Sequence, residues 1–232
     1  MIGLLDLFRK ISALYLQNFS KVVATMLVPL ALPAMGLLLP DSFRTRTLTI
    51  LIMSVFFAVV FFARVWADQT YFRIFFTSSQ GEAVGFSALA RASIALLPGY
   101  AVLVFLWWLV VSFGFVLLLV PGCIFLTWYF FVAPAFLVEG RGILDSFRRS
   151  RELTHGLGMA IFGRFFSFIL ALFFLRMLIG QGIGLLLASA PASGSVFWTA
   201  YAVGLIIDQL MVPLFAALTV VLYNEVRRIK TA

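Results

Sequence analysis

Long runs without a charged side chain recur along this sequence and restrict what it can fold into. Residues 22–39 and 94–119 are two of these runs, and the shorter one has eighteen residues. A helix of about 20 apolar residues crosses the hydrocarbon core of a bilayer, where every backbone polar group has to be bonded within the segment. The runs therefore predict membrane-spanning helices. The composition is 63% hydrophobic and 11% charged, which excludes a soluble fold, because soluble domains are about 45–50% apolar and about 25% charged.

The predicted fold class is all-α: a polytopic membrane helical bundle that forms a single domain over residues 1–232. About six transmembrane helices are expected. They occupy residues 22–39, 47–63, 94–119, 123–138, 165–189 and 195–223. Residues 64–92 mix charged and aromatic side chains, which predicts a water-side loop with partial helix and a break at Ser78-Ser79-Gln80-Gly81.

Two of these spans have alternative interpretations. Residues 123–138 are short for a complete crossing, so this segment is either a tilted span or a re-entrant element. Residues 22–39 could instead belong to a signal peptide, with a small-residue cleavage site at Ala31-Leu32-Pro33-Ala34. The charged segment ahead of this run and the further apolar segments after it favour a retained helix.

Two segments are amphipathic and are expected to lie in the membrane interface. Residues 1–20 form the first helix, and 142–155 form the second. The apolar face of the first carries Leu4, Phe8, Ile11, Tyr15 and Phe19. In the second, Ile143, Phe147, Ser150 and Thr154 share a narrow sector, flanked by Leu144 and Leu153. Its polar side includes Arg148, Arg149 and Arg151, which we expect to form a basic patch facing anionic lipid.

Proline marks two points where the apolar region from residue 94 to residue 138 should change direction. Pro121 has no N–H and Gly122 readily takes a positive φ, so this pair predicts a tight turn between two helices. Pro134 removes one helical hydrogen bond and should kink the segment that contains it. Trp128 and Tyr129 lie in the middle of that segment, which favours packing inside the bundle over anchoring at the interface.

A family resemblance rests on residues of this same region. They are Pro121-Gly122, Trp128, Pro134, Glu139-Gly140, Ser150, Leu153-Thr154 and Gly156, together with the C-terminal run from Leu222 to Arg227. The pattern resembles the multi-pass membrane domain named after glycerophosphoryl diester phosphodiesterases and the related uncharacterised bacterial inner-membrane families of the YciC type. In the phosphodiesterases a separate soluble barrel carries the catalysis. No such barrel is present in this sequence, so the resemblance implies a membrane domain without the enzyme activity.

The distribution of basic residues predicts the topology. Of the 17 Lys and Arg residues, fourteen fall on the termini and on alternate connections if the N-terminus is inside. Only Arg44 and Arg46 fall outside, and Arg176 lies within a span. Because cytoplasmic segments carry the excess of basic residues, both termini and residues 142–155 are expected in the cytoplasm. The resemblance to bacterial inner-membrane families implies that the protein lies in the inner membrane.

Several classes of function are excluded or disfavoured. The net charge of +8 and the pI near 10.3 follow from this membrane asymmetry, so no nucleic-acid partner is expected. A single Cys123 and a single His155 provide neither an internal disulfide nor a zinc site, and no cofactor is expected. The sequence offers no Ser-His pair and no paired carboxylates, so no catalytic residues are assigned.

The favoured function is that of a non-enzymatic membrane protein. Its expected partners are lipids, with anionic headgroups favoured, or another membrane protein or a second copy of this chain. The alternative is a small transporter or channel, for which polar residues inside the spans are required. Only Arg176, Gln181, Asp208 and Gln209 qualify.

Arg176 and Asp208 are predicted to form an ion pair inside the bilayer. Each lies sixteen residues from Ala192, the centre of the connection between the last two spans. Two antiparallel helices that rise about 1.5 Å per residue place them at the same depth. Gly180 and Gly184 are expected to allow the close helix approach that such a pair needs. We interpret the pair as a lock for the hairpin, with a role in moving protons or substrate as the alternative.

Overall fold

The computed structural model describes residues 1–36, 46–188 and 194–231. Within these ranges the chain contains helices and no strand. The helices are α1 (Leu4–Gln17), α2 (Phe19–Gly36), α3 (Arg46–Ser79), α4 (Phe86–Ala95), α5 (Leu97–Leu117), α6 (Leu119–Trp128), α7 (Val132–Glu139), α8 (Ile143–Thr154), α9 (Gly158–Ala188) and α10 (Gly194–Thr231). The predicted all-α fold class is confirmed.

Five helical segments of the described chain are long and apolar enough to cross a membrane. They are Ile52–Ser79, Leu97–Leu117, Leu119–Glu139, Gly158–Leu185 and Val203–Thr231. A sixth crossing results if α1 and the part of α2 up to Ala31 are one span, bent by 75° between them. Five to six apolar helices therefore suggest a multi-pass membrane protein, in agreement with the predicted number.

The first correction concerns residues 64–79, which continue the long helix α3 throughout, where the sequence predicted a loop with only partial helix. A helix can carry charged side chains within an apolar region when each finds a partner or a cavity. Asp68 does so, because its carboxylate accepts a hydrogen bond from the Tyr100 hydroxyl on α5 at 2.6 Å. The predicted break is confirmed, since α3 ends at Ser79 and Gly81 has a φ of 77°.

The second correction concerns Pro121 and Gly122, which do not form the turn between helices. The chain breaks earlier, at Leu118, whose backbone is extended, and Pro121 is the third residue of α6. A proline fits there because the first N–H groups of a helix have no intrahelical partner. Gly122 serves close packing, since a Cβ at this position would lie 2.4 Å from the ring of Phe115 on α5.

The first amphipathic helix is present as α1, and it packs on the bundle with a side that includes much of the predicted face. Ile11 is buried, and Phe8 and Tyr15 are partly buried against the core, whereas Leu4 and Phe19 are exposed. The fully buried residues of α1 are Leu7, Ile11 and Leu14. The three buried residues join the main hydrophobic core, in which α1 contacts α3 and α10. Leu7 and Leu14 lie beside the predicted face, and the sequence did not single them out because apolar residues such as Leu5 and Leu16 surround most of this helix.

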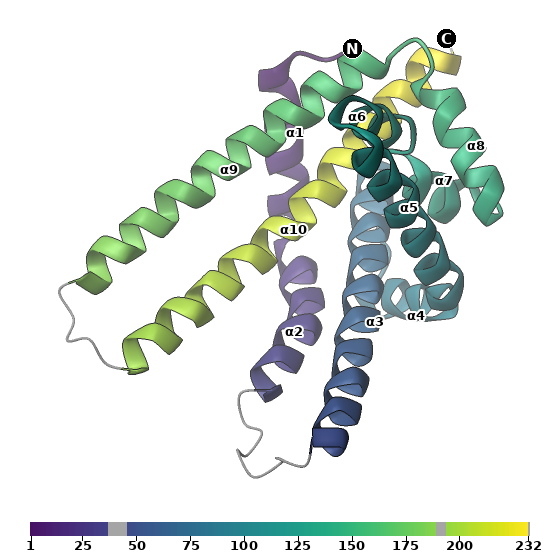
Figure 1. Cartoon of the computed structure of the whole chain (residues 1–232). Coiled ribbons are helices and arrows are strands. Elements are labelled where there is room, and N and C mark those ends of the chain that lie inside the picture. Colours follow the sequence, from purple (N-terminus) through teal and green to yellow (C-terminus); the bar gives the residue numbers. More distant parts are fainter. Residues whose placement is uncertain (37–45, 189–193, 232) are drawn as a thin grey trace.

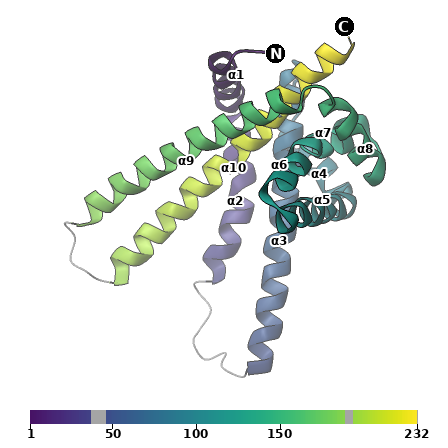
Figure 2. The ribbon, with the colours of Figure 1, turned by 45° about the horizontal axis from the view of Figure 1, so that its top comes forward.

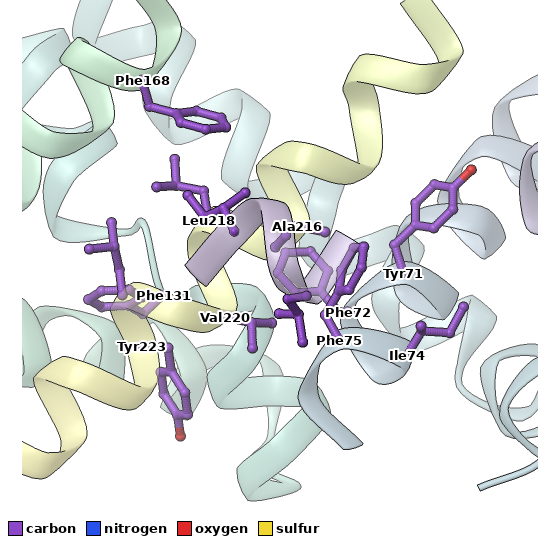
Figure 3. Packing of buried hydrophobic residues seen from close by; sticks show 14 of the residues in the cluster. Tyr71, Phe72, Ile74, Phe75, Phe131, Phe168, Ala216, Leu218, Val220 and Tyr223 are labelled. Atoms are coloured by element: carbon purple, nitrogen blue, oxygen red, sulfur yellow. The ribbon is translucent and has the colours of Figure 1, made fainter. Parts of the chain in front are cut away.

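The main core lies toward the end of the bundle where both chain termini are found (Figure 1). Figure 3 shows its centre, where side chains of α3 and of the C-terminal half of α10 meet Phe131 and Phe168. Tyr71 and Tyr223 lie at the edge of this cluster, and their hydroxyl groups point away from it (Figure 3). At the opposite end, α9 and α10 run together away from the other helices in both views (Figures 1 and 2).

Candidate functional site

The apolar segment Leu119–Glu139 is interrupted between α6 and α7, directly before Pro134. Residues 129–131 form turns, and Pro134 is the third residue of α7. A proline inside a helix would collide with the carbonyl group four residues earlier, which is that of Phe130. The predicted kink at Pro134 is therefore confirmed, as a break in the helix one turn before the proline.

Side chains of α8 and α5 bond the backbone groups that this break releases. Ser150 donates its hydroxyl to the Trp128 carbonyl at 2.7 Å and accepts the Phe131 N–H at 3.0 Å. From α5, the indole N–H of Trp107 donates to the Tyr129 carbonyl at 3.0 Å. Each unbonded backbone group in an apolar environment would cost several kcal/mol, so these contacts fix α8 and α5 against the break.

Glu139, the last residue of α7, accepts hydrogen bonds from three different segments. The donors are the Tyr223 hydroxyl of α10 at 2.7 Å, the Arg149 guanidinium of α8 at 3.1 Å and Arg141 in the connection between α7 and α8. The bond to Glu139 raises the pKa of Arg141, which therefore stays charged. Only 13% of the Glu139 side chain is exposed. A carboxylate held by three donors cross-links the helices and is poorly placed to accept a further proton.

The three arginines of the predicted basic patch have different surroundings. Arg149 bonds Glu139 and Glu152 and is largely buried. Arg151 stacks over the Trp128 ring, with its guanidinium carbon 4.5 Å from the ring centroid. Arg148 is 81% exposed, and its one ion pair with a described residue is a long contact of 3.5 Å to Glu152. Arg148 is thus the arginine of this set that remains available to a membrane surface.

Arg176 and Asp208 form the ion pair that their spacing predicts. The Arg176 Nε lies 2.8 Å from the Asp208 carboxylate, and a second nitrogen donates to it at 3.1 Å. The pair lies at the surface of the helix bundle and not in its interior, because both side chains are about half exposed. A Cβ at Gly180 or at Gly184 would meet no neighbour, so these glycines do not bring helices together. Gln209 faces away from the pair, into a cavity beside Asp68.

Two adjoining, partly open cavities lie on either side of Asp68. The first has a volume of about 310 Å³ and is lined mainly by aromatic and aliphatic side chains of α3, α5, α9, α10 and the α6–α7 break. The second, of about 420 Å³, lies between α2, α3, α5 and α10. Volumes of about 300–1,000 Å³ are typical of small-molecule sites. The polar groups of the second cavity are Arg64, Asp68, Tyr71 and Gln209.

Sequence reasoning assigned no role to Asp68 and Tyr71, because residues 64–92 were predicted to be a water-side loop with partial helix. It did not single out Tyr100, which lies in the predicted span 94–119. The missed signal is the spacing of Arg64, Asp68 and Tyr71, which are four and then three residues apart and so share one helix face. The contact of Glu139 with Tyr223 was also not predicted, although the resemblance includes both residues. Within the described residues, no group of three His, Cys, Asp or Glu side chains could hold a metal ion.

The chain matches no protein-family model, no curated protein and no solved structure.

The Glu139 contacts generate a prediction about stability. Replacing Glu139 by Gln should lower the free energy of unfolding by about 2 kcal/mol, because bonds to a buried charge contribute about 1.5–3 kcal/mol. The matched control is Glu152→Gln, at a half-exposed carboxylate with long contacts of 3.5 Å. Its effect should stay below about 0.5 kcal/mol. Thermal unfolding in detergent measures both, and equal losses would contradict the assigned role of Glu139.

The Arg176–Asp208 pair is tested by a double-mutant cycle. A lone charge at the centre of a spanning helix costs about 2.5–3.5 kcal/mol on insertion scales. Arg176→Leu and Asp208→Leu should therefore each destabilise the protein more than the double variant does, because each single change leaves one charge without its partner. Unfolding temperatures in detergent and in nanodiscs provide the comparison. Simple addition of the two single effects would mean that the residues do not interact.

Proposed function

We propose that this protein is a non-enzymatic, multi-pass protein of the bacterial inner membrane that binds anionic lipid at the cytoplasmic leaflet through α8. The observation that carries this proposal is the outer face of α8. Leu144 and Arg148 are four residues apart and are 79% and 81% exposed. An exposed apolar side chain next to an exposed basic one is typical of a helix that rests in the membrane interface. The apolar group enters the acyl region while the guanidinium binds phosphate.

The way α8 is fixed to the bundle supports this function. Ser150, which bonds the backbone at the α6–α7 break, and Arg149, which bonds Glu139, both face inward. The opposite side of the helix is consequently held outward. The membrane-domain families that the sequence resembles are proposed as relatives on the same grounds, since Trp128, Glu139, Ser150 and Thr154 of the shared pattern all take part in these contacts.

The alternative function, a small transporter with its polar site at Arg176 and Asp208, has less support. These side chains bond each other, so neither charge is left for a passing substrate. Neither residue lines the two cavities beside Asp68. The pair is better explained as the lock of the α9–α10 hairpin.

Lipid binding by α8 is tested by two arginine variants. Arg148→Gln should weaken binding to nanodiscs that contain phosphatidylglycerol by about fivefold, because one basic residue near an anionic surface contributes about 1 kcal/mol. It should leave the unfolding temperature unchanged. Arg149→Gln is the matched control: it should lower the unfolding temperature and affect lipid binding less. If Arg148→Gln retains full binding and full co-purification of anionic lipid, α8 is not the lipid contact.

The proposed orientation is tested by reporter fusions. Both termini lie at the same end of the bundle (Figure 1), as an even number of crossings requires. Fusions after Lys230 and within 142–155 should report a cytoplasmic location, and fusions at 192–194 an external one. A periplasmic signal from 142–155 would overturn the six-span arrangement and would indicate that Leu119–Glu139 re-enters without crossing.

A further inference from the structure

The second cavity beside Asp68 contains polar groups that the fold itself does not use. The Tyr71 side chain is 1% exposed and Gln209 is 5% exposed, and both line this cavity. The Tyr71 hydroxyl and the Gln209 amide nitrogen have no hydrogen-bond partner in the described part of the chain. Figure 3 shows the Tyr71 hydroxyl directed away from Phe72 and Phe75 of the core. A buried donor without a partner costs about 1–3 kcal/mol. Buried atoms of Gln69 and Arg73 also have no partner among the described residues, but only Tyr71 and Gln209 share a cavity, which is the basis for placing a hydrogen-bond acceptor there.

Arg64 also lines the second cavity and adds a positive charge to it. It lies inside the spanning segment Ile52–Ser79, is exposed, and forms no salt bridge with the described residues. A charged side chain within a span is costly and marks a functional position unless another group pairs with it. The guanidinium, the tyrosine hydroxyl and the amide nitrogen are all hydrogen-bond donors. Together they fit the oxygens of a phosphate group.

Asp68 gives the cavity the opposite charge. It lies between Arg64 and Tyr71 on the cavity-facing side of α3, and one of its carboxylate oxygens accepts the Tyr100 hydroxyl. Its other oxygen can accept a second donor, which a primary ammonium group provides. A purely anionic headgroup would be repelled by this carboxylate, and a quaternary ammonium has no N–H to donate. The polar groups of the second cavity therefore match a headgroup that has both a phosphate and a primary amine.

The rim of the cavity is apolar. Phe61 and Trp108, which line it, are 43% and 61% exposed. Asp68 lies eleven residues before the end of α3 at Ser79, which corresponds to about 16 Å along the helix axis. The headgroup would thus sit below the surface, inside the spanning segment, with its chains against an apolar rim. This position favours a membrane lipid over a water-soluble compound.

We propose that the cavity formed by Arg64, Asp68, Tyr71 and Gln209 is a binding site for the headgroup of an amine-bearing phospholipid such as phosphatidylethanolamine. The site is separate from the outer face of α8 and takes a different class of lipid. The phosphate accepts from Arg64, Tyr71 and Gln209. The ammonium group donates to Asp68.

The test uses the full-length protein, stripped of lipid in detergent, with native mass spectrometry to measure affinity and thermal unfolding to measure stability. In the Arg148→Gln variant, in which the proposed α8 contact is weakened, phosphatidylethanolamine should bind more tightly and raise the unfolding temperature more than phosphatidylcholine or phosphatidylglycerol. Soluble glycerophosphoethanolamine should give a much smaller shift. Equal binding of the three lipids would overturn the headgroup assignment, and an equal shift from the soluble compound would overturn the assignment to a lipid.

Two matched tyrosine variants separate binding from folding. Tyr71→Phe should lower the affinity for phosphatidylethanolamine about tenfold, since a bond to a charged phosphate is lost. The same variant should keep or raise the stability of the lipid-free protein, because it removes a buried hydroxyl without a partner. Tyr223→Phe, whose hydroxyl bonds Glu139, should lower stability and leave this affinity unchanged.

The isosteric variant Asp68→Asn tests the amine contact. It should remove the preference for phosphatidylethanolamine over phosphatidylcholine. Wild-type affinity in Tyr71→Phe, or an unchanged headgroup preference in Asp68→Asn, would overturn the proposal.

Discussion

The requirement that buried backbone groups be hydrogen-bonded governs the centre of this structure. Pro134 disfavours a continuous helix from residue 119 to residue 139, and the break observed at residues 129–131 releases backbone donors and acceptors among apolar side chains. Ser150 and Trp107 bond these groups. Because Ser150 has to face the break, the rotation of α8 about its own axis is fixed. The positions of Arg149 beside Glu139 and of Arg148 toward the outside follow from that rotation.

The polar residues of the spans fall into groups that differ in how completely they are bonded. Glu139 has three donors, and Arg176 and Asp208 bond each other. Such groups hold helices together and leave little capacity for a ligand. The cavity beside Asp68 is different, because it combines an arginine that forms no salt bridge with the described residues and two buried donors that have no partner among them. This unequal bonding is the physical reason for assigning structural roles to the first two groups and a ligand to the third.

The two proposed lipid contacts would involve different physical effects. At α8, exposed Leu144 and Arg148 meet a surface, so binding depends on charge density and is weakened by salt. At Asp68 the headgroup would be enclosed by α2, α3, α5 and α10, so binding depends on how well donors and acceptors match.

The sequence by itself determined the helical class, the approximate number of spans, the break near Pro134 and the Arg176–Asp208 pair. These depend on local rules: the length of an apolar run, the missing N–H of proline, and the equal rise of two antiparallel helices. It was wrong about residues 64–79 and about the turn at Pro121-Gly122. Only the tertiary structure showed that Tyr100 lies opposite Asp68, that Phe115 packs on Gly122, and that Tyr223 reaches Glu139. Each of these contacts joins different helices, and the packing of helices against one another cannot be obtained from the periodicity of any single segment.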